Sequence, residues 1–93
     1  MKIKTFIWLD EIVDKLEVKH RISREEVVCA FKGRTHFRFV EKGDRKGEDL
    51  YAAMGRAYGR YVIVFFIYKK DNKALIISAR DMTKGEKKLY EKN

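Results

Sequence analysis

The sequence has few of the residues that small proteins commonly use for metal or disulfide chemistry. Its 93 residues include one cysteine, Cys29, which excludes a disulfide framework and a cysteine-based zinc site within one chain. Cys29 lies in the segment EEVVCAF, whose pattern predicts an amphipathic helix with a buried, inert thiol. No Ser/His/Asp set, metal-ligand spacing or glycine-rich phosphate loop is present. We therefore expect no metal and no cofactor, and any catalysis would use Arg, Lys, His, Glu and Tyr side chains.

Long apolar runs and linkers are also absent from the sequence. The longest run, YVIVFFIY, is too short to span a bilayer and has the length of a buried strand. The first residues, MKIKTFIWLDEI, reach acidic side chains too soon for a secretory signal peptide. We expect a cytoplasmic protein with no membrane partner, folded as one domain over residues 1–93.

Positive charge is abundant in this chain. There are 22 lysines and arginines against 14 acidic residues, which gives a formal net charge of +8. Such a balance favours a polyanionic partner, namely nucleic acid, an acidic protein or an anionic membrane surface. The alternative is a basic surface that only aids solubility.

The apolar pattern predicts an α+β domain. Four consecutive strands with short connections predict an antiparallel meander, and a short N-terminal strand precedes it, with helices packed on one face. The run YVIVFFIY is apolar on both faces and is expected inside the sheet. Two helices carry capping-box sequences, which begin at Ser23 and Thr83. The predicted elements are strand 2–8, helices 10–20 and 23–33, strands 35–41, 49–56, 60–68 and 74–80, and a helix after residue 83.

A meander of this kind brings separate arginines to one end of the sheet. The AYG turn lies at one end and the KKDNK turn at the other, so the last strand ends beside the AYG turn. We therefore expect Arg56, Arg60 and Arg80 to lie close together. Arg34 and His36 join them if their strand pairs with the next one.

Two interpretations of these arginines remain open at this stage. Arg56 and Arg60 would lie nearly opposite each other, and like charges opposed across a sheet are destabilising unless an anion binds between them. Alternatively, both side chains extend into water, where screening makes the repulsion small. The length of the KKDNK turn decides whether Arg80 shares a face with Arg60.

Four further polar residues have both a structural and a functional interpretation. Glu86 fits the capping box of the last helix, and Tyr90 lies one helical turn later, facing the arginines or packing its ring on the sheet. Lys19 and His20 end the first predicted helix, where positive groups interact well with the helix dipole.

Several short segments form a recognisable series along the chain. They are, in order, FIWLDEI, KH-x-I-S-x-E-E-V at 19–27, Phe31, GRAYGRYVIVFF at 55–66 and IISARDMTKGEKKLYE at 76–91. In this order and spacing, from Trp8 to Tyr90, the chain resembles the BrnT family of small basic toxins from bacterial type II toxin–antitoxin pairs. The resemblance implies a RelE-like fold, cleavage of RNA that halts translation, and neutralisation by a ribbon–helix–helix antitoxin that also binds operator DNA.

The resemblance also implies a set of site residues. The candidates for catalysis are Arg56, Arg60, Arg80, Glu86 and Tyr90, and Lys19 and His20 match the family's lysine–histidine step as candidates for RNA binding. The meander geometry, rather than the resemblance, adds Arg34 and His36 to the RNA-binding candidates. The lysine–histidine step departs from the family pattern, because Leu16 stands where the family has Asn and Arg21 where it has Gly.

The chemistry of these side chains fits a metal-independent endoribonuclease. Guanidinium groups of Arg56, Arg60 and Arg80 would stabilise charge on the phosphate, because they bind phosphate oxygens in pairs and stay charged. His36, or else Glu86 or Tyr90, would transfer protons. The alternatives are a non-catalytic module that binds nucleic acid through its backbone, or one that binds only the antitoxin.

Overall fold

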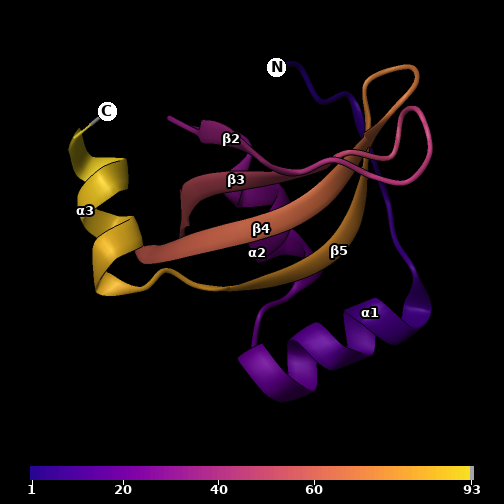
Figure 1. Cartoon of the computed structure of the whole chain (residues 1–93). Helices are drawn as coiled ribbons and strands as arrows, with labels where there is room; N and C mark the ends of the chain where they lie inside the picture. Colours follow the sequence, from indigo (N-terminus) through magenta and orange to yellow (C-terminus); the bar gives the residue numbers. More distant parts are fainter. Residues whose placement is uncertain (93) are drawn as a thin grey trace.

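The computed structural model describes residues 1–92, which form an α+β domain built on one sheet (Figure 1). None of the helices in this range has the length and apolar character needed to cross a membrane. The elements are β1 (Thr5–Ile7), α1 (Asp10–Lys15), the π-helical segment η1 (Leu16–His20), α2 (Arg24–Ala30), β2 (His36–Glu41), β3 (Leu50–Ala57), β4 (Arg60–Lys69), β5 (Lys73–Asp81) and α3 (Lys84–Lys92).

The sheet has five strands in the order β1-β5-β4-β3-β2. Strands β2 to β5 form the predicted antiparallel meander, and β4 is an interior strand as expected. The short N-terminal strand lies beside β5 and runs parallel to it. The sheet is therefore mixed, with β1 and β2 at its two edges.

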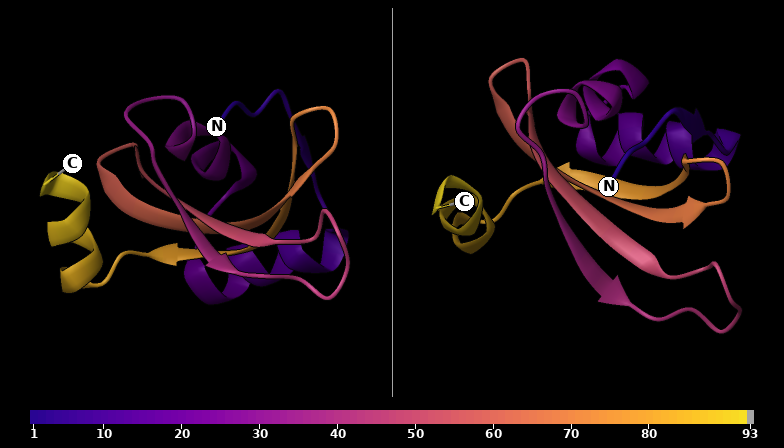
Figure 2. Two further views of the ribbon diagram at one scale, coloured as in Figure 1. Left: turned by 45° about the horizontal axis from the view of Figure 1, so that its top comes forward. Right: turned by 90° about the horizontal axis from the view of Figure 1, so that it is seen from above.

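The first core lies between the sheet and the segment α1–η1–α2. The predicted capping box opens α2: the backbone N–H of Glu26 donates to the Ser23 hydroxyl at 3.2 Å, and the Ser23 N–H donates to the Glu26 carboxylate at 3.0 Å. Val27 and Ala30 of α2 are buried against the strands. Figure 2 shows α1 and α2 together on one side of the sheet, with α3 apart from them at the end of the strands.

A second, smaller core lies on the opposite face, beneath α3. Tyr90 is the buried residue of α3, and it packs against Ala52, Met54 and Ile63. The expectation that all helices pack on one face is therefore wrong. The physical reason is the double-sided apolar character of β4, since a strand that is apolar on both faces needs cover on both.

One glycine sets how closely α2 approaches the sheet. A Cβ atom at Gly55 on β3 would lie 2.0 Å from the carbonyl oxygen of Ala30 at the end of α2. Because the clash is with backbone, no side-chain rotation relieves it. The close packing of α2 on β3 depends on the absence of a side chain here.

We predict that Gly55→Ala lowers the free energy of unfolding by about 3 kcal/mol, because helix and strand must separate to admit the methyl group. Chemical denaturation of the purified variant measures this loss. Gly33→Ala is the matched control, since its Cβ would meet nothing within 4 Å. Equal stability of the two variants would contradict the proposed close approach.

Candidate functional site

The face of the sheet that carries α3 collects basic side chains from several elements. His36 pairs with Met54 across β2 and β3, and Arg38 pairs with Ala52. Met54 and Ala52 both lie in the core beneath α3. Because directly paired residues share a face of the sheet, His36 and Arg38 also lie on the α3 face.

Arg56 lies on this face beside an aromatic ring rather than a carboxylate. It pairs with Tyr61, and its guanidinium carbon lies 4.5 Å from the centroid of the Tyr61 ring. The ammonium group of Lys87 lies 4.3 Å from the same centroid. Arg56 is exposed and makes no ion pair with any residue in 1–92. It lines a hollow of about 470 Å³ with Gly33, Arg34, Tyr61, Tyr90 and Glu91.

Arg80 fixes the beginning of α3 through a bidentate ion pair with Glu86. It pairs with Ile63 in the sheet and so lies on the α3 face. Its Nη1 and Nη2 atoms donate to the two carboxylate oxygens of Glu86 at 2.7 and 2.9 Å. The same carboxylate accepts the backbone N–H of Thr83, which completes the predicted capping box. Glu86 is thus shared between the cap of α3 and Arg80.

This ion pair shifts the pKa values of both Glu86 and Arg80. The hydrogen bond from Arg80 lowers the pKa of Glu86 from 4.5 to about 2, against the opposing effect of burial. The pKa of Arg80 is raised, chiefly by the same hydrogen bond. Glu86 is therefore ionised at neutral pH and is a weak base, which argues against proton transfer by this carboxylate.

Tyr90 and Arg34 fasten the other end of α3. The Tyr90 hydroxyl donates to the backbone carbonyl of Arg34 at 2.6 Å, and Nη2 of Arg34 donates to the carbonyl of Tyr90 at 2.6 Å. The guanidinium of Arg34 also lies 4.7 Å from the centroid of the Tyr90 ring. The ring packs on the sheet, as one interpretation of the sequence expected, and the hydroxyl is engaged in holding α3.

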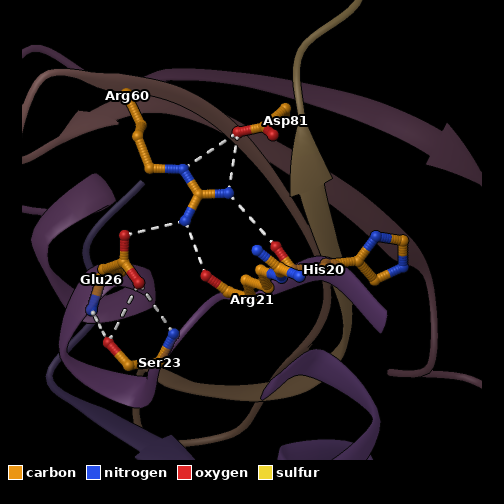
Figure 3. Close-up of polar contacts among 6 residues, drawn as sticks. All are labelled: His20, Arg21, Ser23, Glu26, Arg60 and Asp81. Atoms are coloured by element: carbon orange, nitrogen blue, oxygen red, sulfur yellow. Dashed lines mark hydrogen bonds and ion pairs between the residues drawn. The ribbon is translucent and has the colours of Figure 1, made fainter. Parts of the chain in front are cut away.

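Arg60 lies on the other face of the sheet, where it joins four elements of the fold (Figure 3). Its Nε donates to Asp81 at 3.1 Å, and Nη1 donates to Glu26 at 3.0 Å. The carbonyls of Arg21 and His20 accept from Nη1 and Nη2 at 2.8 and 3.2 Å. Burial tends to lower the pKa of Arg60, but the hydrogen bonds with Glu26 and Asp81 outweigh it and raise the pKa.

The expected convergence of three arginines is therefore wrong for Arg60. Tyr58 and Gly59 form a two-residue turn, so Ala57 pairs with Arg60 and Arg56 pairs with the next residue. Side chains alternate between faces along a strand, and this offset places Arg56 and Arg60 on opposite faces. Arg56 and Arg80 do share the α3 face.

Lys19 and His20 lie away from the α3 face as well. Both are in η1, which packs on the side of Arg60. His20 contributes its backbone carbonyl to Arg60, and Figure 3 shows its ring directed away from that guanidinium. Arg21, which follows, has a φ of 51° and so adopts the left-handed region.

Arg38 and Lys87 are members of the α3 face that we did not identify from the sequence. The signal for Arg38 was its spacing, because Arg34, His36 and Arg38 alternate along RTHFR. Arg38 lines a second hollow of about 260 Å³ with Phe39, Val40, Ala52, Ile63, Phe65, Arg80 and Glu86.

Comparison with known protein families identifies the family to which this chain belongs. Residues 8–86 match the family of the ribonuclease toxin BrnT of type II toxin–antitoxin systems. The chain belongs to the BrnT family. No curated protein and no solved structure matches it. As a BrnT toxin it has an antitoxin partner and an RNA substrate by family. The matched region includes Arg34, His36, Arg38, Arg56 and Arg80.

We predict that Glu86→Gln destabilises this BrnT chain at pH 7 by about 1–2 kcal/mol, a value discounted for the partial exposure of Arg80. Glutamine keeps the capping box and removes the charge. Because the folded pKa of Glu86 lies below its ordinary value, the stabilisation is complete above pH 4.5 and is lost as the pH falls toward 2.

Thermal melts of parent and variant from pH 7 to pH 2 measure this difference. The difference in Tm between the parent and Glu86→Gln should disappear as the pH falls from 4.5 to about 2. The control is Glu17→Gln, at an exposed position that makes no ion pair within the described chain. A gap that does not change with pH would contradict the role of the charge.

Proposed function

We propose that this toxin is an endoribonuclease whose RNA-binding surface is the α3 face, and that its cleavage of RNA halts translation. One observation carries the proposal: cations from β2, β3, β5 and α3 share this face with two tyrosines and a histidine. RNA offers phosphates to such cations, while the Tyr61 ring orients Arg56 and Lys87 and the buried Tyr90 ring supports α3. The surface comprises Arg34, His36, Arg38, Arg56, Tyr61, Arg80 and Lys87.

The reaction that suits these residues uses the RNA's own 2′-hydroxyl as the nucleophile. The 2′-oxygen forms a bond to the adjacent phosphorus and gives its proton to a base. The bond from phosphorus to the 5′-oxygen breaks, and that oxygen takes a proton from an acid. The products are a 2′,3′-cyclic phosphate and a 5′-hydroxyl. The protein must transfer two protons and stabilise the added charge on the phosphoryl oxygens.

We assign Arg56 and Arg80 to the phosphate. Arg56 is oriented by the Tyr61 ring, and a cation–ring contact leaves its N–H groups available for hydrogen bonds. Arg80 donates from Nη1 and Nη2 to Glu86, but a guanidinium has five N–H groups, and Nε has no partner among residues 1–92. Glu86 then positions Arg80 rather than transferring a proton.

His36 is the side chain that we assign to proton transfer. Histidine is the residue that ordinarily changes charge near neutral pH, and His36 is half-buried on the α3 face. Tyr90 becomes a positioning residue, because its hydroxyl holds α3 in place. We give Arg60, Lys19 and His20 no contact with the scissile phosphate, since they lie on the opposite face.

The partner in this proposal is a ribbon–helix–helix antitoxin in the cytoplasm. The family belongs to type II systems, in which toxin and antitoxin are both proteins. The net charge of +8 favours an acidic surface on that partner. Operator DNA would be contacted only through the antitoxin.

A binding module without cleavage is the second candidate function. The observation in its favour is that Glu86 and Tyr90 are both engaged in fastening α3, which leaves one residue for proton transfer. Incubation of a labelled single-stranded RNA with the purified toxin in EDTA separates the two candidates. Binding without strand cleavage under these conditions would favour the module.

We predict that Arg56→Ala and Arg80→Ala each reduce the rate of RNA cleavage by about 100- to 1000-fold, the loss typical of one preorganised charge-stabilising donor. Arg80→Lys should recover only part of the loss, because an ammonium cannot contact two oxygens as a guanidinium does. Timed cleavage of one RNA measures the rates, and thermal melts report the fold.

Three further variants make the test specific. Arg45→Ala, in the exposed β2–β3 loop at the far end of the sheet, should leave the rate unchanged. Glu86→Gln should slow cleavage less than Arg80→Ala does, because the guanidinium of Arg80 stays but loses the charge that positions it. His36→Gln should slow cleavage, because an amide does not transfer a proton as an imidazole does. Full activity of Arg56→Ala would contradict the assignment of the α3 face.

A further inference from the structure

The turn between β3 and β4 carries an aromatic residue where the backbone disfavours one. Tyr58 and Gly59 have φ values of 49° and 84°, the pattern of a two-residue hairpin turn that prefers Asn-Gly or Asp-Gly. A bulky side chain at positive φ is strained. The β4–β5 turn of the same chain places Asp71 and Asn72 at φ 64° and 58°, and both residue types tolerate that region. The turn conformation therefore does not explain the tyrosine.

Packing does not explain Tyr58 either. It is 74% exposed, and it makes no hydrogen bond, ring contact or cation–ring contact with the described part of the chain. The four other tyrosines each contribute to a core cluster. Tyr58 is thus a strained, solvent-facing ring that contributes nothing visible to the stability of the fold.

The Tyr58 ring borders a hollow that has its own positive charge. The hollow has a volume of about 440 Å³ and lies along α2. Arg24 and Val28 lie four residues apart on one side of α2, and Lys32, which also lines the hollow, follows two residues beyond the end of the helix. Both cations are exposed, and neither makes an ion pair within residues 1–92. The lining is completed by Trp8, Glu25 and Cys29.

We propose that this hollow binds one unpaired nucleobase of the RNA substrate, stacked on the Tyr58 ring, with the neighbouring phosphates contacted by Arg24 and Lys32. An exposed aromatic ring in one hollow with two cations that make no ion pair within residues 1–92 is the chemistry of single-stranded nucleic-acid binding.

The position of the turn links this hollow to the α3 face. Arg56 lies near the end of β3, two residues before Tyr58, and faces the α3 side, whereas the hollow lies along α2. A single strand that passes around the β3–β4 turn would therefore meet Arg56 and then Tyr58. The inference rests on the proposed function, and it places a nucleotide next to the scissile phosphate in a defined pocket.

The decisive variant is Tyr58→Asn, because its effects on folding and on binding should have opposite signs. Asparagine suits the turn, so the Tm should rise by a few degrees. Loss of the ring should weaken binding of a short single-stranded RNA by roughly 5- to 100-fold. The probe carries 2′-O-methyl groups, which block cleavage, and fluorescence anisotropy measures its affinity at fixed salt. Tyr58→Phe keeps a stacking ring and should bind like the parent.

A base-paired RNA of the same length is the second probe. Its bases are stacked on one another, so Tyr58→Asn should leave the affinity for the duplex unchanged. Equal affinity of parent and Tyr58→Asn for the single strand would overturn the inference and leave the proposed function intact. The inference would also be overturned if Tyr58→Asn lost equal affinity for the single strand and the duplex, or if its Tm fell. Loss of antitoxin binding by Tyr58→Asn with RNA binding kept would overturn it as well. A parent toxin that binds neither RNA would overturn the proposed function itself.

Discussion

The register of the β3–β4 hairpin is the constraint on which the arrangement of charge in this toxin depends. Tyr58 and Gly59 alone connect the two strands, so Ala57 pairs with Arg60. Every side chain on both strands is then assigned to a face, because the period of a strand is two. Arg56 lies on the α3 face and Arg60 on the α2 face for this reason. One residue more in the turn would exchange the faces of β4, and Arg60 would then lie on the α3 face.

The same residues that offer positive charge on the α3 face also hold α3 in place. Arg80 binds Glu86 at the start of the helix, and Arg34 binds Tyr90 near its end. The helix has only one buried side chain, and a short helix of mostly charged residues has little intrinsic stability in water. Its position therefore depends on these polar contacts. An RNA phosphate that draws Arg80 or Arg34 away from its present partner would also loosen α3.

The sequence was sufficient to predict the meander, the interior position of β4 and both capping boxes, because each follows from a local pattern. Alternation and apolar length identify the strands, and Ser23 and Thr83 mark the two helix starts. The face occupied by α3 was harder, although YVIVFFIY already indicated that both faces of β4 are covered. Membership of the BrnT family is confirmed, and it came from the order of several motifs rather than from any one of them.

The site was predicted only in part, because the face of the sheet on which a side chain lies changes when a turn is one residue longer or shorter. The AYG turn was taken to place Arg56 and Arg60 opposite each other, whereas the pairing is offset by one residue. A bulge between Phe65 and Phe66 then shifts the pairing with β5, so the face of Arg80 was not deducible by counting along the strands. The partners of Arg60 come from η1, α2 and β5, and no local pattern connects such distant residues.

Arg60 and Arg56, on opposite faces of the sheet, are held by physically different contacts. On the α2 face, Arg60 meets two carboxylates and two carbonyls, so its charge is neutralised and its N–H groups are occupied. On the α3 face, Arg56 and Lys87 are placed over the Tyr61 ring, which orients a cation without neutralising it. An oriented but unneutralised cation keeps its attraction for an incoming anion and needs little rearrangement to bind it. The aromatic rings of this face are therefore part of its electrostatics, and their removal would cost the surface its preorganisation even where every positive charge remained.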